Sequence, residues 1–282
     1  MGTFKTISIK TGLLLLLWAA VFFPLYPGLF ETWLNDSNNS HGILVPFIAA
    51  FFIWQKRDEV NDLSPQMDLL GALLFIASLV VYILSFAGAI AVAARSMIVF
   101  SLIGLVLYNY GPVIFKKLAF PLFFLLFMIP VPISIIGLVS LPLQRLATDI
   151  SATLINLTSI PVYQEGNMLY FAQTQLEVAE ACSGIHSMMA MLMLGTIFVY
   201  KNRMTPTGMT MLLALTIPIA IIANITRVTG TGILAHFYGA RVAKGFLHDF
   251  SGMAVFAFGL VLLMATYLLI QRVQKDKLQE IS

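Results

Sequence analysis

Unbroken apolar runs constrain this chain more than any other feature of its sequence. The run from Leu69 to Ala94 contains no charged residue, and similar runs recur along the chain. A backbone segment within lipid must satisfy its own hydrogen bonds, so it crosses as a helix or in a closed barrel. The runs lack the alternating pattern of barrel strands. We therefore expect an all-α fold: a polytopic integral membrane helical bundle.

Composition supports this fold class. The 282 residues are 59% hydrophobic and only 10% charged, whereas soluble domains carry roughly 25% charged residues. We expect one domain over residues 1–282, with about eight transmembrane helices. The expected spans are 10–27, 41–55, 69–88, 91–109, 115–130, 184–200, 208–226 and 251–271.

A long segment, Val131 to Ala181, separates the fifth expected span from the sixth. Its first part, Ile133 to Ser159, is amphipathic, and we expect it to lie in the membrane interface or to re-enter it. The stretches 168–171 and 176–178 flank a short polar turn. This pattern predicts a small hairpin just before Cys182.

Lysine and arginine placement predicts the topology. With the N-terminus inside, eleven of the 16 cations fall in cytoplasmic segments and five in outer ones, which satisfies the positive-inside rule. The net charge of +3 therefore reflects membrane topology, and no nucleic-acid partner is expected. This orientation places the hairpin, Cys182, the polar loop 227–250 and the loop 38–42 on the outer face. We expect a multi-pass protein of the cytoplasmic (inner) membrane, with its site facing the periplasm or cell exterior.

Cys182 is the only cysteine, and it precedes an apolar run that begins near Ser187. A thiol at a helix N-terminus meets a partial positive charge, which favours the nucleophilic thiolate. The alternative is that Cys182 is an inert packing residue.

Three polar clusters enter apolar spans at the expected outer face. They are Glu180, Cys182 and His186; Asn224 to Arg227; and His248 to Gly252. An ionisable group at membrane depth is costly and is therefore a functional candidate. The alternatives are that Arg227 is a snorkelling cation and that His248 marks the headgroup level.

These side chains fit acyl transfer. A thiolate can attack a peptide carbonyl and form a thioester. A histidine can take the thiol proton and return it to the leaving amine, and an arginine can donate hydrogen bonds to the oxyanion. No close ligand spacing indicates a metal site, and no cofactor is expected. We expect His236 to be structural.

The sequence resembles the exosortase/archaeosortase family. The resemblance is carried by Glu180-Ala-Cys182-Ser-Gly-Ile, Asn224-x-x-Arg227 and His248-Asp-Phe-Ser-Gly252, supported by Ser40-His41-Gly42 and Glu165-Gly166-Asn167. It implies a cysteine endopeptidase/transpeptidase that cleaves C-terminal sorting signals of exported proteins. Such a signal has a Pro-Glu-Pro-type motif, a membrane helix and a basic tail. The implied partners are these membrane-anchored proteins and the lipid bilayer.

The resemblance also implies residue roles. Cys182 would be the nucleophile, Arg227 the transition-state stabiliser and His248 the general acid/base. His186 stands where many relatives carry arginine, so it could compete with His248 as base. The candidate substrate-binding residues are Glu180, His186, Asn224, His41 and Arg241.

Two other function classes stay open from the residues alone. Proline and glycine within apolar segments, such as Pro130 and Pro218, also fit the broken helices of a transporter or channel. A membrane acyltransferase could use Cys182 to carry a lipid-linked or sugar-linked acyl group.

Overall fold

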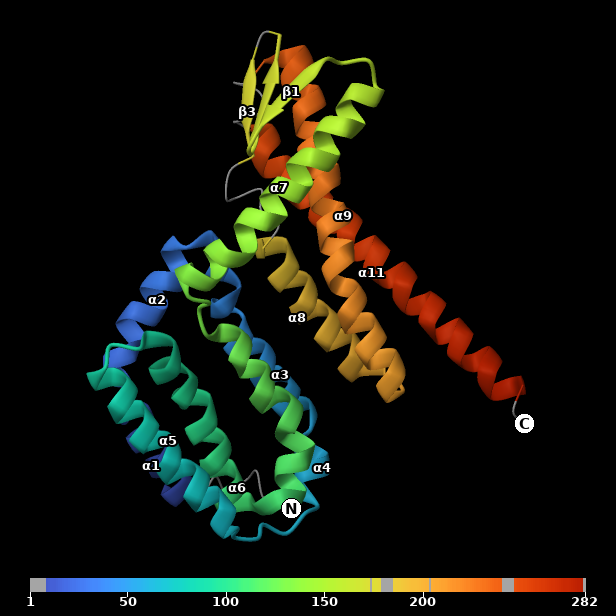
Figure 1. Cartoon of the computed structure of the whole chain (residues 1–282). Helices are drawn as coiled ribbons and strands as arrows, with labels where there is room; N and C mark the ends of the chain where they lie inside the picture. Colours follow the sequence, from blue (N-terminus) through green and yellow to red (C-terminus); the bar gives the residue numbers. More distant parts are fainter. Residues whose placement is uncertain (1–8, 173, 179–184, 203, 240–245, 281–282) are drawn as a thin grey trace. The chain divides into compact units, whose positions relative to one another are not determined.

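The protein is described here from a computed structural model that covers residues 9–172, 174–178, 185–202, 204–239 and 246–280 (Figure 1). The chain divides into two compact units, Met1–Pro132 and Ile133–Ser282, and each is described by itself. Nearly all of the described secondary structure is helical, as the apolar runs predicted.

Four described helices are long and apolar enough to cross a membrane: Leu69–Ala87, Ala91–Met128, Pro206–Tyr238 and Gly252–Gln274. The pair Gly12–Val21 and Phe23–Asn35 is bent by 50° and makes a fifth if it acts as one span. The chain is thus a helical membrane protein, but this count does not support eight spans. One reason is that the helix in the second expected span, Val45–Gln55, has 11 residues and is about 17 Å long, short of a ~30 Å hydrocarbon core.

The first unit is a set of helices joined by short turns. Its elements are α1 (Ile9–Val21), η2 (Phe23–Leu25), α2 (Tyr26–Asn35), η3 (Ser37–Ile43), α3 (Val45–Gln55), α4 (Arg57–Asn61), α5 (Leu69–Ala87), α6 (Ala91–Phe124) and η4 (Leu125–Met128). Helix α6 is broken at Gly111, whose φ of 79° is in the left-handed region. The fourth and fifth expected spans are the two arms on either side of this break.

Glycines let α5 and the first arm of α6 approach closely. A Cβ on Gly104 would stand 2.6 Å from the backbone N of Phe75, and one on Gly71 would stand 2.1 Å from the N of Tyr108. Lipid chains are as apolar as the side chains, so helices in a bilayer associate mainly through such close packing.

Charged groups gather at the α4 end of the first unit. Glu59 accepts hydrogen bonds from Lys56 and, at 3.0 Å, from Lys117 on α6. These bonds, first that of Lys56 and then that of Lys117, lower the pKa of the Glu59 carboxyl. The guanidinium of Arg57 lies 4.3 Å above the centre of the Trp54 ring. The Glu59 carboxylate is therefore stabilised in its ionised form by the two lysines.

The second unit combines helices with a small sheet (Figure 1). Its elements are α7 (Ile133–Leu157), β1 (Val162–Glu165), β2 (Met168–Phe171), β3 (Gln175–Glu177), α8 (Ile185–Asn202), α9 (Pro206–Tyr238) and α11 (Phe246–Glu280). The strands are antiparallel in the order β1-β2-β3, so the sheet has one strand more than the expected hairpin. Glu165 pairs with Met168, which leaves a two-residue turn that starts at Gly166 with φ of 61°. A glycine at that position is typical of a tight hairpin turn.

The sheet packs on α7 and α9 through one buried apolar cluster. Ile155 of α7 is fully buried in this cluster, and a Cβ on Gly232 of α9 would stand 2.7 Å from its Cδ1. The absence of a side chain at Gly232 therefore sets how closely α9 approaches α7.

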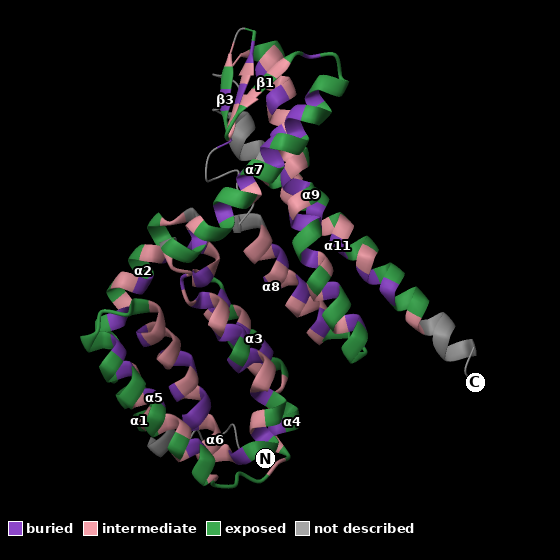
Figure 2. Ribbon diagram, viewed as in Figure 1, coloured by how far each residue is buried: buried purple, intermediate pink, exposed green. Residues whose placement is uncertain are grey.

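Helices α8, α9 and α11 share a second apolar cluster, centred on Met191, Leu212 and Leu263. The Gln274 Nε2 of α11 donates to the Oγ1 of Thr205, the N-cap of α9, at 2.7 Å. The end of α11 thus meets the start of α9, so these two helices are antiparallel. Figure 2 shows buried and exposed residues alternating along each of them.

The close approach at Gly104 gives a testable prediction. Gly104→Ala should lower the free energy of unfolding by about 1–3 kcal/mol, because the methyl group meets backbone that cannot move aside. The matched control is Gly137→Ala in α7, where nothing lies within 4 Å and alanine favours the helix. Thermal unfolding in detergent measures both, and equal stability of the two variants would contradict the packing.

Candidate functional site

Arg227 lies half-buried on α9, and its Nε atom is buried. Helix α9 has 33 residues and is about 50 Å long, which exceeds the ~30 Å hydrocarbon core. Asn224, one turn before Arg227, is 5% exposed. Asn224 and the Nε atom of Arg227 are therefore inside the protein, which argues against Arg227 as a purely snorkelling cation.

The guanidinium of Arg227 lies beside the start of α11. Its Nη2 is 3.8 Å from the position that a Cβ on Gly252 would occupy. His248 lies in the first turn of α11, one turn before Gly252. The structure therefore brings Arg227 to the helix end that carries His248, although the His248 side chain is not among the described ones.

The other predicted site residues are placed less fully. Cys182 and Glu180 fall in 179–184 and Arg241 in 240–245, outside the described residues. His186 is in the first turn of α8, with no description of its side chain. His41 lies in η3 of the first unit. The distances from the Cys182 sulfur to Arg227 and His248 thus stay predictions.

The chain that leads to Cys182 is anchored in the core beneath the sheet. Val178, four residues before the thiol, is 1% exposed and belongs to the same buried cluster as Val228, the residue after Arg227. The N–H of Val178 donates to the carbonyl of Asn167 at 2.8 Å, and Asn167 Nδ2 donates to the carbonyl of Val178 at 3.3 Å. One packed core thus fixes both the strand that precedes the thiol and the helix turn that carries the guanidinium.

A buried polar face of α7 is a site feature that the sequence interpretation missed. Ser140, Gln144, Thr148 and Ser151 are each at most 2% exposed. Gln144 Nε2 donates to Ser140 Oγ at 2.8 Å, and Ser151 Oγ donates to the carbonyl of Ile225 on α9 at 3.3 Å. Their spacing already indicated one helix face. This face lies against protein, and the expected position of the helix in the membrane interface, or re-entering it, stays a prediction.

His236 of α9 packs against β2 of the sheet. Its ring centre is 6.2 Å from that of Phe171 in β2 and 5.1 Å from that of Phe237. These contacts fit the structural role expected for it. Within the described ranges, no group of three or more His, Cys, Asp or Glu side chains could hold a metal ion.

The hydrogen bond from the Asn167 side chain to the carbonyl of Val178 leads to a prediction for Cys182. Asn167→Ala should loosen the strand exit and raise the rate at which a thiol reagent labels Cys182 severalfold. Because Cys182 is the only cysteine, labelling needs no other substitution.

The control is Asn156→Ala, which breaks comparable bonds to Val162 at the other end of the sheet. It should leave the labelling rate within about twofold of the parent, since additivity holds for contacts that do not share partners. Equal rates for the two variants would show that Asn167 does not position the thiol segment.

A match to a known protein family includes all the residues of the candidate site. A family model described as transmembrane exosortase, of the EpsH type, matches residues 33–265, which is most of the chain. The match includes Cys182, Arg227 and His248. No curated protein and no solved structure matches the sequence. The matched region runs from α2 into α11, and the chain belongs to the transmembrane exosortase family.

Proposed function

We propose that the chain is a cysteine endopeptidase/transpeptidase. It cleaves C-terminal sorting signals, with a Pro-Glu-Pro-type motif, from exported membrane-anchored proteins at the outer face of the cytoplasmic membrane. The observation that carries this proposal is the approach of the Arg227 guanidinium to the start of α11, 3.8 Å from a Cβ position on Gly252. The proposal is also supported by the core that Val178 and Val228 share, because Val178 precedes Cys182 by four residues.

The chemistry follows from the proposed roles. The Cys182 thiolate attacks the scissile carbonyl carbon, and the carbonyl oxygen becomes an oxyanion that accepts hydrogen bonds from Arg227. The C–N bond then breaks, and His248 gives a proton to the leaving amine. The resulting thioester is resolved by water, an amine or a lipid nucleophile. A buried guanidinium suits this role because it stays charged in a site of low polarity.

The antiparallel pair of α9 and α11 supports the proposed orientation. Lys201 and Arg272 lie near the end where Thr205 meets Gln274, and Arg227 and Gly252 lie at the other end. The positive-inside rule assigns the cationic end to the cytoplasm. Arg227 and the start of α11 then face the periplasm or cell exterior.

The eight-span topology is part of the same proposal. Lys117 lies inside Ala91–Met128, in its second half, and pairs with Glu59 at 3.0 Å. Charged groups at the centre of a membrane span are costly, so one crossing by this whole segment is unfavourable. The break at Gly111 instead supports two crossings, with the Glu59 cluster at the cytoplasmic surface.

Substrate contacts complete the proposal. His248 is favoured as general base over His186, because Arg227 of α9 lies beside the start of α11, which carries His248. His186, Glu180, Asn224, His41 and Arg241 are proposed to bind the sorting signal, with Arg241 attracting its acidic residue.

The nucleophile is tested by Cys182→Ala and Cys182→Ser in cells that express a tagged protein with a sorting signal. Both changes should abolish cleavage while membrane insertion stays normal, because no other thiol can form the thioester. Immunoblotting of the tagged protein measures cleavage. Unchanged processing in Cys182→Ala would remove the proposal, and a trapped thioester carrying a lipid acyl group would favour an acyltransferase.

The proposed role of the Arg227 guanidinium is tested by substitutions at Arg227 itself and at Gly252. Arg227→Lys should reduce cleavage about 10²–10³-fold, because it keeps the charge but loses the planar pair of donors. Gly252→Ala should be tolerated, since 3.8 Å is an ordinary contact distance, whereas Gly252→Leu should push the guanidinium aside and lose at least about tenfold.

Gly230→Leu on α9 is the matched control, because nothing lies within 4 Å of its Cβ position. It should keep activity near that of the parent in the same immunoblot. If Gly252→Leu were equally active, the contact with Arg227 would have no part in the reaction.

A further inference from the structure

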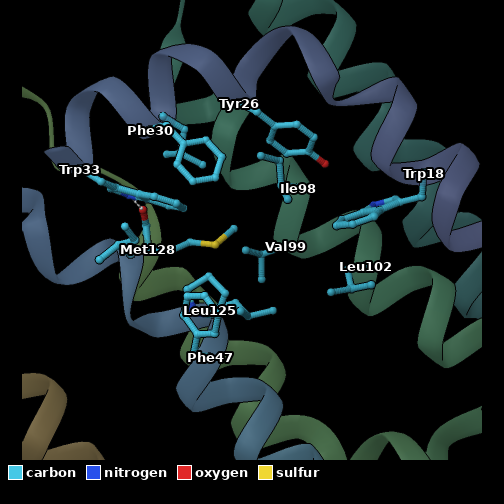
Figure 3. Close-up of a pocket in the computed structure, with 13 residues that line it drawn as sticks. Trp18, Tyr26, Phe30, Trp33, Phe47, Ile98, Val99, Leu102, Leu125 and Met128 are labelled. Carbon is cyan, nitrogen blue, oxygen red and sulfur yellow. Dashed lines mark hydrogen bonds between the residues drawn. The ribbon is translucent and has the colours of Figure 1, made fainter.

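An apolar cavity of about 560 Å³ lies among α1, α2, α3 and α6 of the first unit (Figure 3). Its lining offers no polar surface, and its volume falls within the roughly 300–1,000 Å³ of small-ligand pockets. Neither the family's chemistry nor the residues proposed for cleavage account for this cavity.

Two tryptophans form walls of the cavity, and their polar atoms are already satisfied by the protein. Trp18 Nε1 donates to Ser101 Oγ at 2.8 Å, and Trp33 Nε1 donates to the carbonyl of Met128 at 2.9 Å. A Cβ on Gly42 would stand 2.3 Å from the Trp33 Nε1, so Gly42 makes room for this ring. The rings are thus fixed, and what they present to the cavity is apolar surface.

A cation, Arg95, is hydrogen-bonded to α2 next to residues that line this cavity. Arg95 Nη2 donates to the carbonyl of Gly28 at 3.1 Å, and the neighbouring Leu29 lines the cavity. Ile98 and Leu102 of the lining follow Arg95 at helical spacing on α6. Among the described residues, no ion pair involves Arg95. Its guanidinium has five N–H donors, so the Gly28 carbonyl leaves others for a second acceptor.

We propose that this cavity binds an acyl chain of an anionic phospholipid, whose phosphate contacts Arg95. In a bilayer, the medium that meets an open apolar cavity is hydrocarbon, and a helix about 10 Å wide is too large to fill this one. Moving a lipid chain from the bilayer into the cavity gains little by itself, because both are apolar. The preference for an anionic lipid therefore comes from the headgroup at Arg95. This site does not depend on the proposed cleavage activity.

The experiment uses the chain's own tryptophans. Trp54 lies outside the cavity and is removed as Trp54→Phe, which leaves Trp18 and Trp33 as the only tryptophans. The full-length protein is placed in nanodiscs that contain phosphatidylglycerol or phosphatidylcholine with the same dibrominated acyl chains. Bromine quenches tryptophan fluorescence only at short range.

We expect saturable quenching that reaches its midpoint at about fivefold less phosphatidylglycerol than phosphatidylcholine, the preference that one cationic contact near a membrane surface provides. Unbrominated phosphatidylglycerol should reverse the quenching, which tests occupancy without any cavity substitution. Arg95→Gln should remove the preference, and Lys116→Gln, which changes a cation outside the cavity, should keep it.

Three outcomes would overturn the site. They are equal midpoints for the two lipids, quenching that rises linearly with lipid fraction without saturation, and an unchanged preference in Arg95→Gln. The first two would identify ordinary boundary lipid, and the third would show that Arg95 does not select the headgroup.

Discussion

The candidate site depends on the packed core that α7, α9 and the small sheet share. Ile155 lies against α9 at Gly232, and around this contact the core buries Val178 before the thiol and Val228 after the guanidinium. Acyl transfer needs reacting groups held within about 0.5 Å of their productive places. A buried apolar core provides such control, because native interiors are too densely packed to allow side chains to drift.

Polar groups within the second unit are used in two different ways. Hydrogen bonds within α7 join Ser140, Gln144 and Thr148. Ser151 donates instead to the carbonyl of Ile225, which links α7 to the turn of α9 before Arg227. The Arg227 guanidinium lies beside Gly252 of α11, with its Nη2 3.8 Å from the position that a Cβ would occupy. The bond from Ser151 thus joins α7 to α9, and the charged group lies beside the start of α11.

The helical class and the antiparallel strands before the thiol segment could be predicted from sequence, because periodicity is a local property. The role of Arg227 stays a prediction. The lengths of the spans were less predictable. Hydropathy separated 91–109 from 115–130, the two arms on either side of the break at Gly111, but it does not register the 11-residue length of Val45–Gln55, which depends on backbone geometry. Amphipathicity likewise shows that one face of α7 is polar, but not whether water or protein covers that face, and the structure buries it in protein.

The motifs that carry the family resemblance contain two kinds of residue: some are proposed to take part in the reaction, and others allow the backbone to pack or turn. Each of three includes a glycine whose role is geometric: Gly42 makes room for Trp33, Gly166 turns β1 into β2, and Gly252 leaves space for Arg227. A side chain at Gly42 would collide with an indole that is fixed by its bond to Met128, and it would disturb the cavity that this indole lines. Loss of function on changing a motif glycine therefore does not by itself identify a catalytic neighbour. Among these three glycines, Gly252 is the one whose neighbour is a guanidinium, a group that can donate hydrogen bonds to an oxyanion. Substitutions at Gly252 therefore test the proposed reaction, and substitutions at the other two test packing or turn geometry.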